Sequence, residues 1–152
     1  MAIDRGPGTE IIRCHHFEGI DSTRTTLIFG AQHHIYTVLS ITVCCINLQT
    51  STNLSYLNIQ GYDTFAGTST QLNRILGINI PAGETFVWND KFSFNGHEPV
   101  DFTGPLDSVA KQDAIADQGG GASQKLMFDM TSSDDGGQNY DVHVTYIDQN
   151  NE

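Results

Sequence analysis

The feature that most constrains the fold of this chain is an alternation of apolar and polar residues with a period of two. The segment 140–147 shows it most clearly: Tyr140, Val142, Val144 and Tyr146 alternate with Asp141, His143 and Thr145. Leu126, Phe128 and Met130 alternate in the same way in residues 125–130. Because successive side chains of a β-strand point to opposite faces of a sheet, this spacing indicates strands with one buried face.

Further runs of β-branched and aromatic residues predict more strands at 25–29, 35–48, 54–62, 75–80 and 85–94. In the second run, Leu39, Ile41, Val43 and Cys45 fall on one face, which predicts a core strand. The polar residues 49–53 then favour a turn, so we expect runs 35–48 and 54–62 to form a hairpin. Pro81 and Gly83 predict another turn before the aromatic run 85–94.

Seven or eight strands without crossover helices predict an all-β fold, an antiparallel β-sandwich of jelly-roll or Ig-like type. The length of 152 residues suits one domain. Residues 1–24 are polar and interrupted by glycine and proline, so we expect an extended N-terminal arm. The sandwich is predicted over 25–148 with a polar tail at 149–152, and the acidic, Gly-rich segment 96–124 is expected to be a long insertion loop.

The charge balance argues against two classes of partner. Seven Lys and Arg residues against eighteen Asp and Glu give a net charge of −11, which repels nucleic acid and anionic membrane surfaces. No apolar run is long enough to cross a membrane, and the N-terminus lacks the pattern of a signal peptide. With three cysteines, Cys14, Cys44 and Cys45, we expect reduced thiols and assembly in a reducing cytoplasm, with Cys45 in the core.

No catalytic or metal-binding pattern is convincing in this sequence. The pairs His15-His16 and His33-His34 invite a zinc hypothesis with Cys14, but neighbours on a strand point to opposite faces and cannot chelate one ion. The acidic residues of segment 134–141 lack the spacing of a calcium loop. Glu84, Asp90, Glu98 and Asp101 offer carboxylates for glycoside hydrolysis, as any acidic β-protein does. We therefore expect no enzyme activity, no cofactor and no metal.

Three segments carry a resemblance to a known family. They are CCINL at 44–48, IPAGETFVW at 80–88 with KFSF at 91–94, and VHVTYI at 142–147. In this order the chain resembles small β-sandwich structural proteins of tailed-bacteriophage virions, of the capsid decoration, cement or tail-associated type. The resemblance covers residues 25–95 and 124–148. It departs from the family pattern after Gly96, where the insertion begins.

The resemblance implies a non-enzymatic virion protein, most specifically a capsid decoration or cement protein. Such a protein would associate with itself as a trimer or ring and bind other virion proteins such as the major capsid protein. The interface candidates are Ile11, Ile12, Phe17, His33, His34, Leu106 and Val109. Two alternatives stay open: a tail, neck or fibre-associated structural protein, and a carbohydrate-binding module for host adhesion that stacks sugars on Trp88, Tyr56 and Tyr62.

Overall fold

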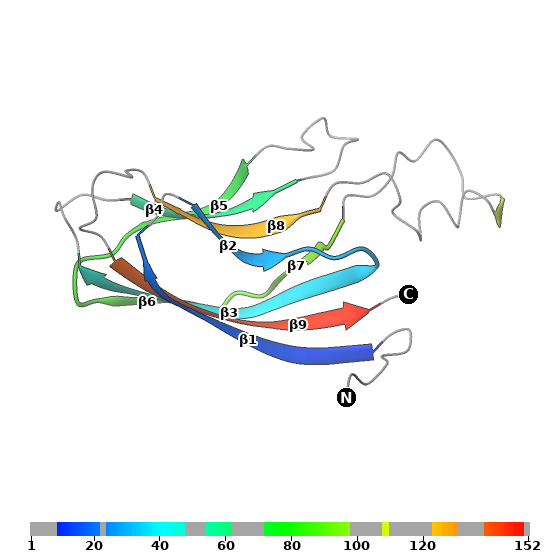
Figure 1. Cartoon of the computed structure of the whole chain (residues 1–152), viewed down its shortest axis with the longest axis horizontal. Coiled ribbons are helices and arrows are strands. Elements are labelled where there is room, and N and C mark those ends of the chain that lie inside the picture. The colour runs from blue at the N-terminus through cyan, green and yellow to red at the C-terminus, as the bar shows by residue number, and fades with distance from the viewer. Residues whose placement is uncertain are drawn as a thin grey trace.

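The computed structural model describes residues 9–21, 24–47, 54–61, 72–97, 108–109, 123–130 and 139–150. Nine strands lie in these ranges: β1 (Thr9–Ile20), β2 (Arg24–Phe29), β3 (His34–Asn47), β4 (Leu54–Gln60), β5 (Leu72–Asn79), β6 (Thr85–Trp88), β7 (Phe92–Asn95), β8 (Lys125–Met130) and β9 (Asn139–Asn150). They form two antiparallel sheets that are packed as two layers (Figure 1). The predicted all-β antiparallel sandwich is therefore confirmed.

The larger sheet has the order β1-β9-β3-β6, and β7 also pairs with β3. Ile41 lies opposite Trp88 and Val38 lies opposite Phe92, so β6 and β7 act as one strand with an extra residue at the break between them. The indole Nε1 of Trp88 donates a hydrogen bond of 2.6 Å to the carbonyl oxygen of Asp90 within this break. The smaller sheet has the order β2-β8-β4-β5.

This strand order identifies the sandwich as a jelly roll. With β6 and β7 counted as one strand, the first strand pairs with the last, the second with the second-last, the third with the sixth and the fourth with the fifth. The chain thus behaves as one long antiparallel ribbon wrapped around a core, which is the jelly-roll arrangement. In an Ig-like sandwich the first two strands pair with each other, whereas here β1 and β2 belong to different sheets.

The core follows the alternation in the sequence. Tyr140, Val142, Val144 and Tyr146 of β9 are at most 3% exposed, and Leu126, Phe128 and Met130 of β8 face them from the other sheet. In β3, Ile41, Val43 and Cys45 are buried as predicted, but Leu39 is not on that face. A bulge between Val38 and Ser40 shifts the alternation, and Val38 takes the buried position instead.

Two expectations from the sequence are wrong. Residues 9–20, predicted to lie in an arm, form β1, which pairs with β9 from Thr9 opposite Asn150 to Ile20 opposite Tyr140. This pairing places β9 between β1 and β3, and β9 extends to Asn150, into the predicted tail. The predicted hairpin of 35–48 with 54–62 does not form, because β3 and β4 lie in opposite sheets of the wrapped ribbon.

The ends of the predicted insertion 96–124 lie side by side. The backbone amide of Gln124 donates a hydrogen bond to the carbonyl oxygen of Gly96 (2.9 Å). The backbone amide of Gly30 donates to the carbonyl oxygen of Gln124 (2.8 Å). The amide of Gly96 donates in turn to the carbonyl oxygen of His34 (2.8 Å). A Cβ atom on Gly30 would overlap the carbonyl oxygens of Gly96 and Gln124, so the close approach requires glycine.

Candidate functional site

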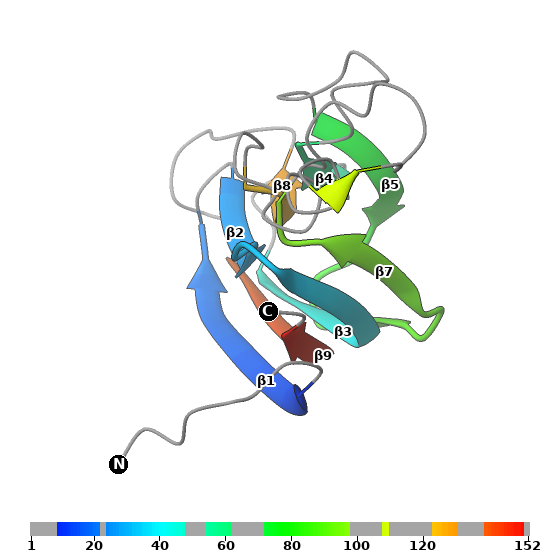
Figure 2. The same ribbon diagram turned by 90° about the vertical axis from the view of Figure 1, so that its right-hand side faces the viewer.

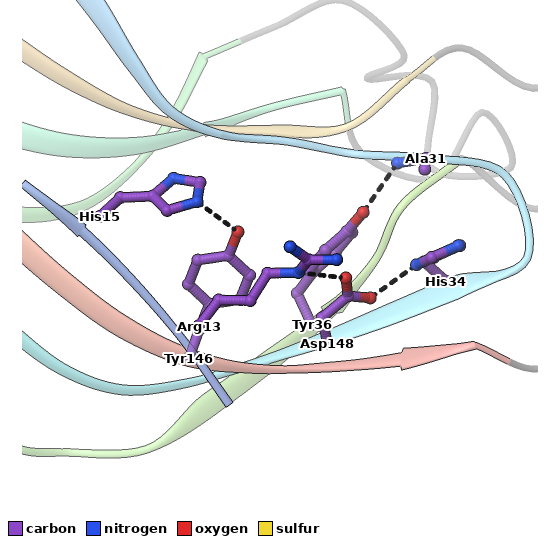
Figure 3. Close-up of polar contacts among 7 residues, drawn as sticks. All are labelled: Arg13, His15, Ala31, His34, Tyr36, Tyr146 and Asp148. Atoms are coloured by element: carbon purple, nitrogen blue, oxygen red, sulfur yellow. Dashed lines mark hydrogen bonds and ion pairs between the residues drawn. The ribbon is translucent and has the colours of Figure 1, made fainter. Parts of the chain in front are cut away.

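A buried carboxylate ties three strands of the larger sheet together. Asp148 continues the inward-facing row of β9 after Tyr146 and is 4% exposed. Arg13 of β1 donates from Nε to its Oδ2 at 2.8 Å, and His34 of β3 donates from Nδ1 to its Oδ1 at 2.6 Å (Figure 3). Because β1 and β3 are the two neighbours of β9, we call Arg13, His34 and Asp148 the carboxylate clamp.

The surroundings of Asp148 keep it ionised. Burial by itself raises the pKa of a carboxyl group, but the hydrogen bonds and positive charge that His34 and Arg13 offer outweigh that effect. The pKa of Asp148 is consequently held below its ordinary value. Both carboxylate oxygens accept hydrogen bonds from the clamp, so the group suits a structural anchor better than a proton donor.

Two tyrosines extend the clamp into the core. The hydroxyl oxygen of Tyr36 accepts a hydrogen bond of 3.0 Å from the amide of Ala31, and its ring stacks on His34 with centroids 6.0 Å apart. The hydroxyl of Tyr146 lies 3.3 Å from Nε2 of His15. Burial raises the pKa of Tyr146 to about 12, so its hydroxyl stays protonated. The network therefore fixes β1 and the turn before β3 against β9 (Figure 3).

The interface candidates on β1 divide between its two faces. Ile11 lies opposite Asp148 and Phe17 opposite Val142, so both side chains are on the inner face and half-buried. Phe17 packs against the core cluster. Ile12 points to the outer face and is 68% exposed, which makes it the β1 candidate that a partner can reach.

The other interface candidates lie in different places. His33 adopts a positive φ of 63° in the turn before β3, and the side chain of His34 belongs to the carboxylate clamp. Val109 is 71% exposed, and Leu106 lies outside the described residues. The six predicted positions that the structure describes therefore do not form one continuous surface.

Two of the glycan candidates, Trp88 and Tyr56, lie in different sheets. Trp88 belongs to the larger sheet and is half-buried, with its ring edge-on to Phe92 at 6.4 Å. Tyr56 belongs to β4 of the smaller sheet, and the guanidinium of Arg74 lies 3.6 Å from the centroid of its ring. That ring face is thus covered by a side chain of the same molecule. Tyr62 lies outside the described residues.

The strand β1 exposes a long edge that sequence reasoning missed. It pairs with β9 on one side, and no other described strand pairs with its second side (Figure 2). Its regular part extends from Thr9 to Phe17, where a bulge begins, and it carries Glu10 and Arg13 but no proline or lysine. By comparison, β5 has 8 residues, β2 has 6, and the β6–β7 edge is interrupted. Soluble proteins ordinarily shorten, charge or cover such edges, because the unpaired backbone groups can bind another strand.

The remaining polar candidates are dispersed. Cys14 and His16 point to the outer face of the larger sheet, while His15 points inward to Tyr146. In the ranges that the structure describes, no three His, Cys, Asp or Glu side chains are grouped as a metal ion requires. The three cysteines are free thiols, and burial raises the pKa of Cys45. Nowhere in those ranges does a helix have the length and apolar character needed to cross a membrane.

Comparisons with known proteins show a structural similarity and no sequence match. No family model matches the sequence, and no curated protein matches it either. Among solved structures, the chain is similar to one described as the acidic stable capsid structure of Helicobacter pylori bacteriophage KHP30. The superposition has a TM-score of 0.47 with 9% sequence identity, and it covers 93% of this chain and 90% of the other.

Proposed function

We propose that this chain is a non-enzymatic structural protein of a bacteriophage virion. More specifically, we propose a capsid decoration or cement protein that associates with itself and binds the surface of the particle. The motifs at 44–48, 80–94 and 142–147 support the virion class through their resemblance to small phage β-sandwich proteins. The jelly roll is compatible with it, because this fold is common in viral capsid domains, although lectins and cupins use it too.

The observation that carries the proposal is the second edge of β1. In residues 10–17, every other backbone amide and carbonyl points away from β9, toward the side where no described strand lies. An extended segment of a partner can add to such an edge through main-chain hydrogen bonds. Ile12, beside this edge, offers an exposed apolar side chain to the same partner.

The carboxylate clamp supports a docking edge that is already formed before a partner binds. Arg13 lies in the middle of β1, and its contact with Asp148 holds the strand in register with β9. A strand that is anchored in this way presents its outer edge in a fixed conformation, so little conformational entropy is lost when a partner binds. We infer that β1 is a preformed docking edge rather than a loosely attached arm.

The first test is the mass of the purified protein by light scattering, with Ile12→Lys as the variant. A lysine beside an edge strand opposes pairing with another strand, so the variant is expected to shift the protein toward its monomer mass of 16.7 kDa. Ile46→Lys is the matched control, because Ile46 is 52% exposed at the end of the interior strand β3. A wild-type protein that is monomeric at all concentrations would contradict self-association through this edge.

The second test concerns the location in the particle. An antibody against the purified protein is expected to label the capsid surface of intact phage particles in electron micrographs. Labelling of the tail or neck alone would support the alternative of a tail-associated protein. Absence of the protein from purified particles would contradict a virion role altogether.

A further inference from the structure

The side chains of β1 follow a pattern that is nearly symmetric about Cys14. On the inner face of the larger sheet, Ile11 and Phe17 each lie three residues from Cys14, and both are half-buried. Arg13 and His15 lie one residue from Cys14 on the same inner face. The strand therefore offers an apolar side chain at the same distance in either direction from Cys14. A second copy of β1 that runs in the opposite direction matches this pattern.

We infer that β1 pairs antiparallel with β1 of a second copy, with Cys14 opposite Cys14. This inference rests on the self-association in the proposed function, and it names the partner segment and its direction. Two copies that meet in this way are related by a two-fold axis perpendicular to the sheet, so their larger sheets join into one sheet with both inner faces on the same side. The contact is isologous and closes after two copies. It gives a dimer, whereas the resemblance implies a trimer or ring.

The register follows from the side chains that lie opposite each other across the new pair. Directly opposite residues of an antiparallel pair share a face, with Cβ atoms about 4.5–5.5 Å apart. With Cys14 at the centre, Ile11 of each copy lies opposite Phe17 of the other, so two apolar pairs are removed from water on the inner face. A centre at Arg13 would place two arginines opposite each other, and a centre at His15 would place Phe17 opposite Arg13.

The outer face of the new pair gains a further contact. Ile12 of each copy lies opposite His16 of the other in this register. Ile12 is 68% exposed in the single chain, so the imidazole ring covers an apolar side chain that the rest of the larger sheet leaves open. A lysine in place of Ile12 loses this contact, which gives a second reason for the expected effect of Ile12→Lys.

The bulge that begins at Phe17 sets the ends of the paired segment. The regular strand supplies residues 11–17 of each copy, and this range contains no proline and no lysine. The next residue, Glu18, would meet Glu10 of the other copy, which is unfavourable for two carboxylates. Glu18 is 81% exposed and lies 3.5 Å from Nε2 of His16 of its own chain, beyond the end of the regular strand. The pairing therefore stops before the two acids lie opposite each other.

Oxidation of the native thiols with copper–phenanthroline tests the pairing. Opposite residues of an antiparallel pair have Cα atoms about 4.5–5.5 Å apart, and a disulfide needs about 4.4–6.8 Å. Cys14 is an exposed free thiol, so the wild type is expected to give a covalent dimer of twice the 16.7 kDa chain mass on a non-reducing gel. Cys14→Ser is expected to give no such dimer. Cys44→Ser removes a thiol from β3, two strands from the axis, and is expected to leave the yield unchanged.

Two variants in a Cys14→Ser background test the direction and register. Ile12→Cys and His16→Cys are expected to cross-link when they are co-expressed, because these positions lie opposite each other in the pair. Each variant alone is expected to give no cross-link, since its two copies of the new thiol are four positions apart, about 13 Å along the strands. Efficient cross-linking of either variant alone would overturn the antiparallel register.

The outcomes separate this inference from the proposed function. If light scattering shows an assembly that Ile12→Lys dissociates, but neither the wild type nor the co-expressed variants cross-link, pairing of β1 with β1 is overturned. Self-association through the edge would then stand, with a different segment as its partner. A wild type that is monomeric at all concentrations would overturn both.

Discussion

Replacement of Asp148 by asparagine tests whether the carboxylate clamp stabilises the larger sheet. The carboxylate accepts hydrogen bonds from His34 at 2.6 Å and from Arg13 at 2.8 Å, and the Asp148 side chain is 5% exposed. Asparagine keeps one acceptor oxygen, but its amide group must face one of these two donors. The variant therefore loses the charge and at least one of the two hydrogen bonds.

The expected loss follows from the burial of the two partners. A buried hydrogen bond to a charged group contributes about 1.5–3 kcal/mol, which applies to His34, whose side chain is 23% exposed. Arg13 is 43% exposed, so water replaces much of its contact, and its share is about 0–1 kcal/mol. The asparagine oxygen still accepts one hydrogen bond, which offsets part of this loss. Asp148→Asn is therefore expected to lower the free energy of unfolding by roughly 2 kcal/mol. The midpoint of thermal unfolding should fall by about 4–8 °C for a chain of this size.

Urea denaturation at several pH values is the assay. Because the folded protein holds the pKa of Asp148 below its ordinary value, the stabilising effect is present above the unfolded pKa of about 3.9. It is lost as the pH falls below that value through the folded pKa, so the wild-type advantage should shrink there.

Asp141→Asn on the same strand is the matched control. Oδ1 of Asp141 accepts a hydrogen bond of 2.9 Å from the amide of Gly19 at an exposed position, and an asparagine oxygen can replace it. This variant is expected to stay within about 0.5 kcal/mol of wild type. An equal effect of both substitutions, or a wild-type advantage that does not shrink below about pH 3.9, would refute the role assigned to the clamp.

Two further predictions concern the base of the insertion and the thiols. Gly30→Ala is expected to lower the free energy of unfolding by about 3 kcal/mol, because its Cβ disturbs the three backbone hydrogen bonds at Gly96 and Gln124, each contributing about 1 kcal/mol. Gly19→Ala is the control in the same urea assay. Gly19 has open space around it but a φ of 61°, so this variant should lose only about 1 kcal/mol. Cys14 is expected to react with a thiol reagent in the native protein, whereas Cys45 is expected to react only after unfolding. Mass spectrometry of the labelled peptides measures both reactions. Rapid labelling of Cys45 in the native protein would contradict its burial.

The sequence was sufficient to predict the buried faces of strands but not their partners. Alternation identified the inward row of β9 from Tyr140 to Tyr146 and of β8 from Leu126 to Met130, because burial acts on each strand separately. The pairing of β3 and β4 was predicted wrongly, because a polar turn between two alternating runs fits both a hairpin and a crossing between sheets. Only the wrapping of the whole ribbon decides between them.

The strand β1 and the carboxylate clamp were missed for related reasons. The inward positions of β1 include Arg13 and His15, which obscure its apolar alternation. Asp148 continues the inward row of β9 by one further step, a signal that the sequence did contain. Its partners are 135 and 114 residues away along the chain, so their meeting depends on the register of two long-range strand pairs.

Hydrogen exchange of the β1 backbone, followed as the protein concentration rises, tests the central claim most directly. If the second edge of β1 is a docking edge, the outward amides of residues 10–17 should exchange rapidly in the monomer and become protected as the light-scattering mass increases. The inward amides, bonded to β9, should be protected throughout. An increase in mass without any change in β1 exchange would contradict the claim that β1 is the edge through which this jelly roll assembles.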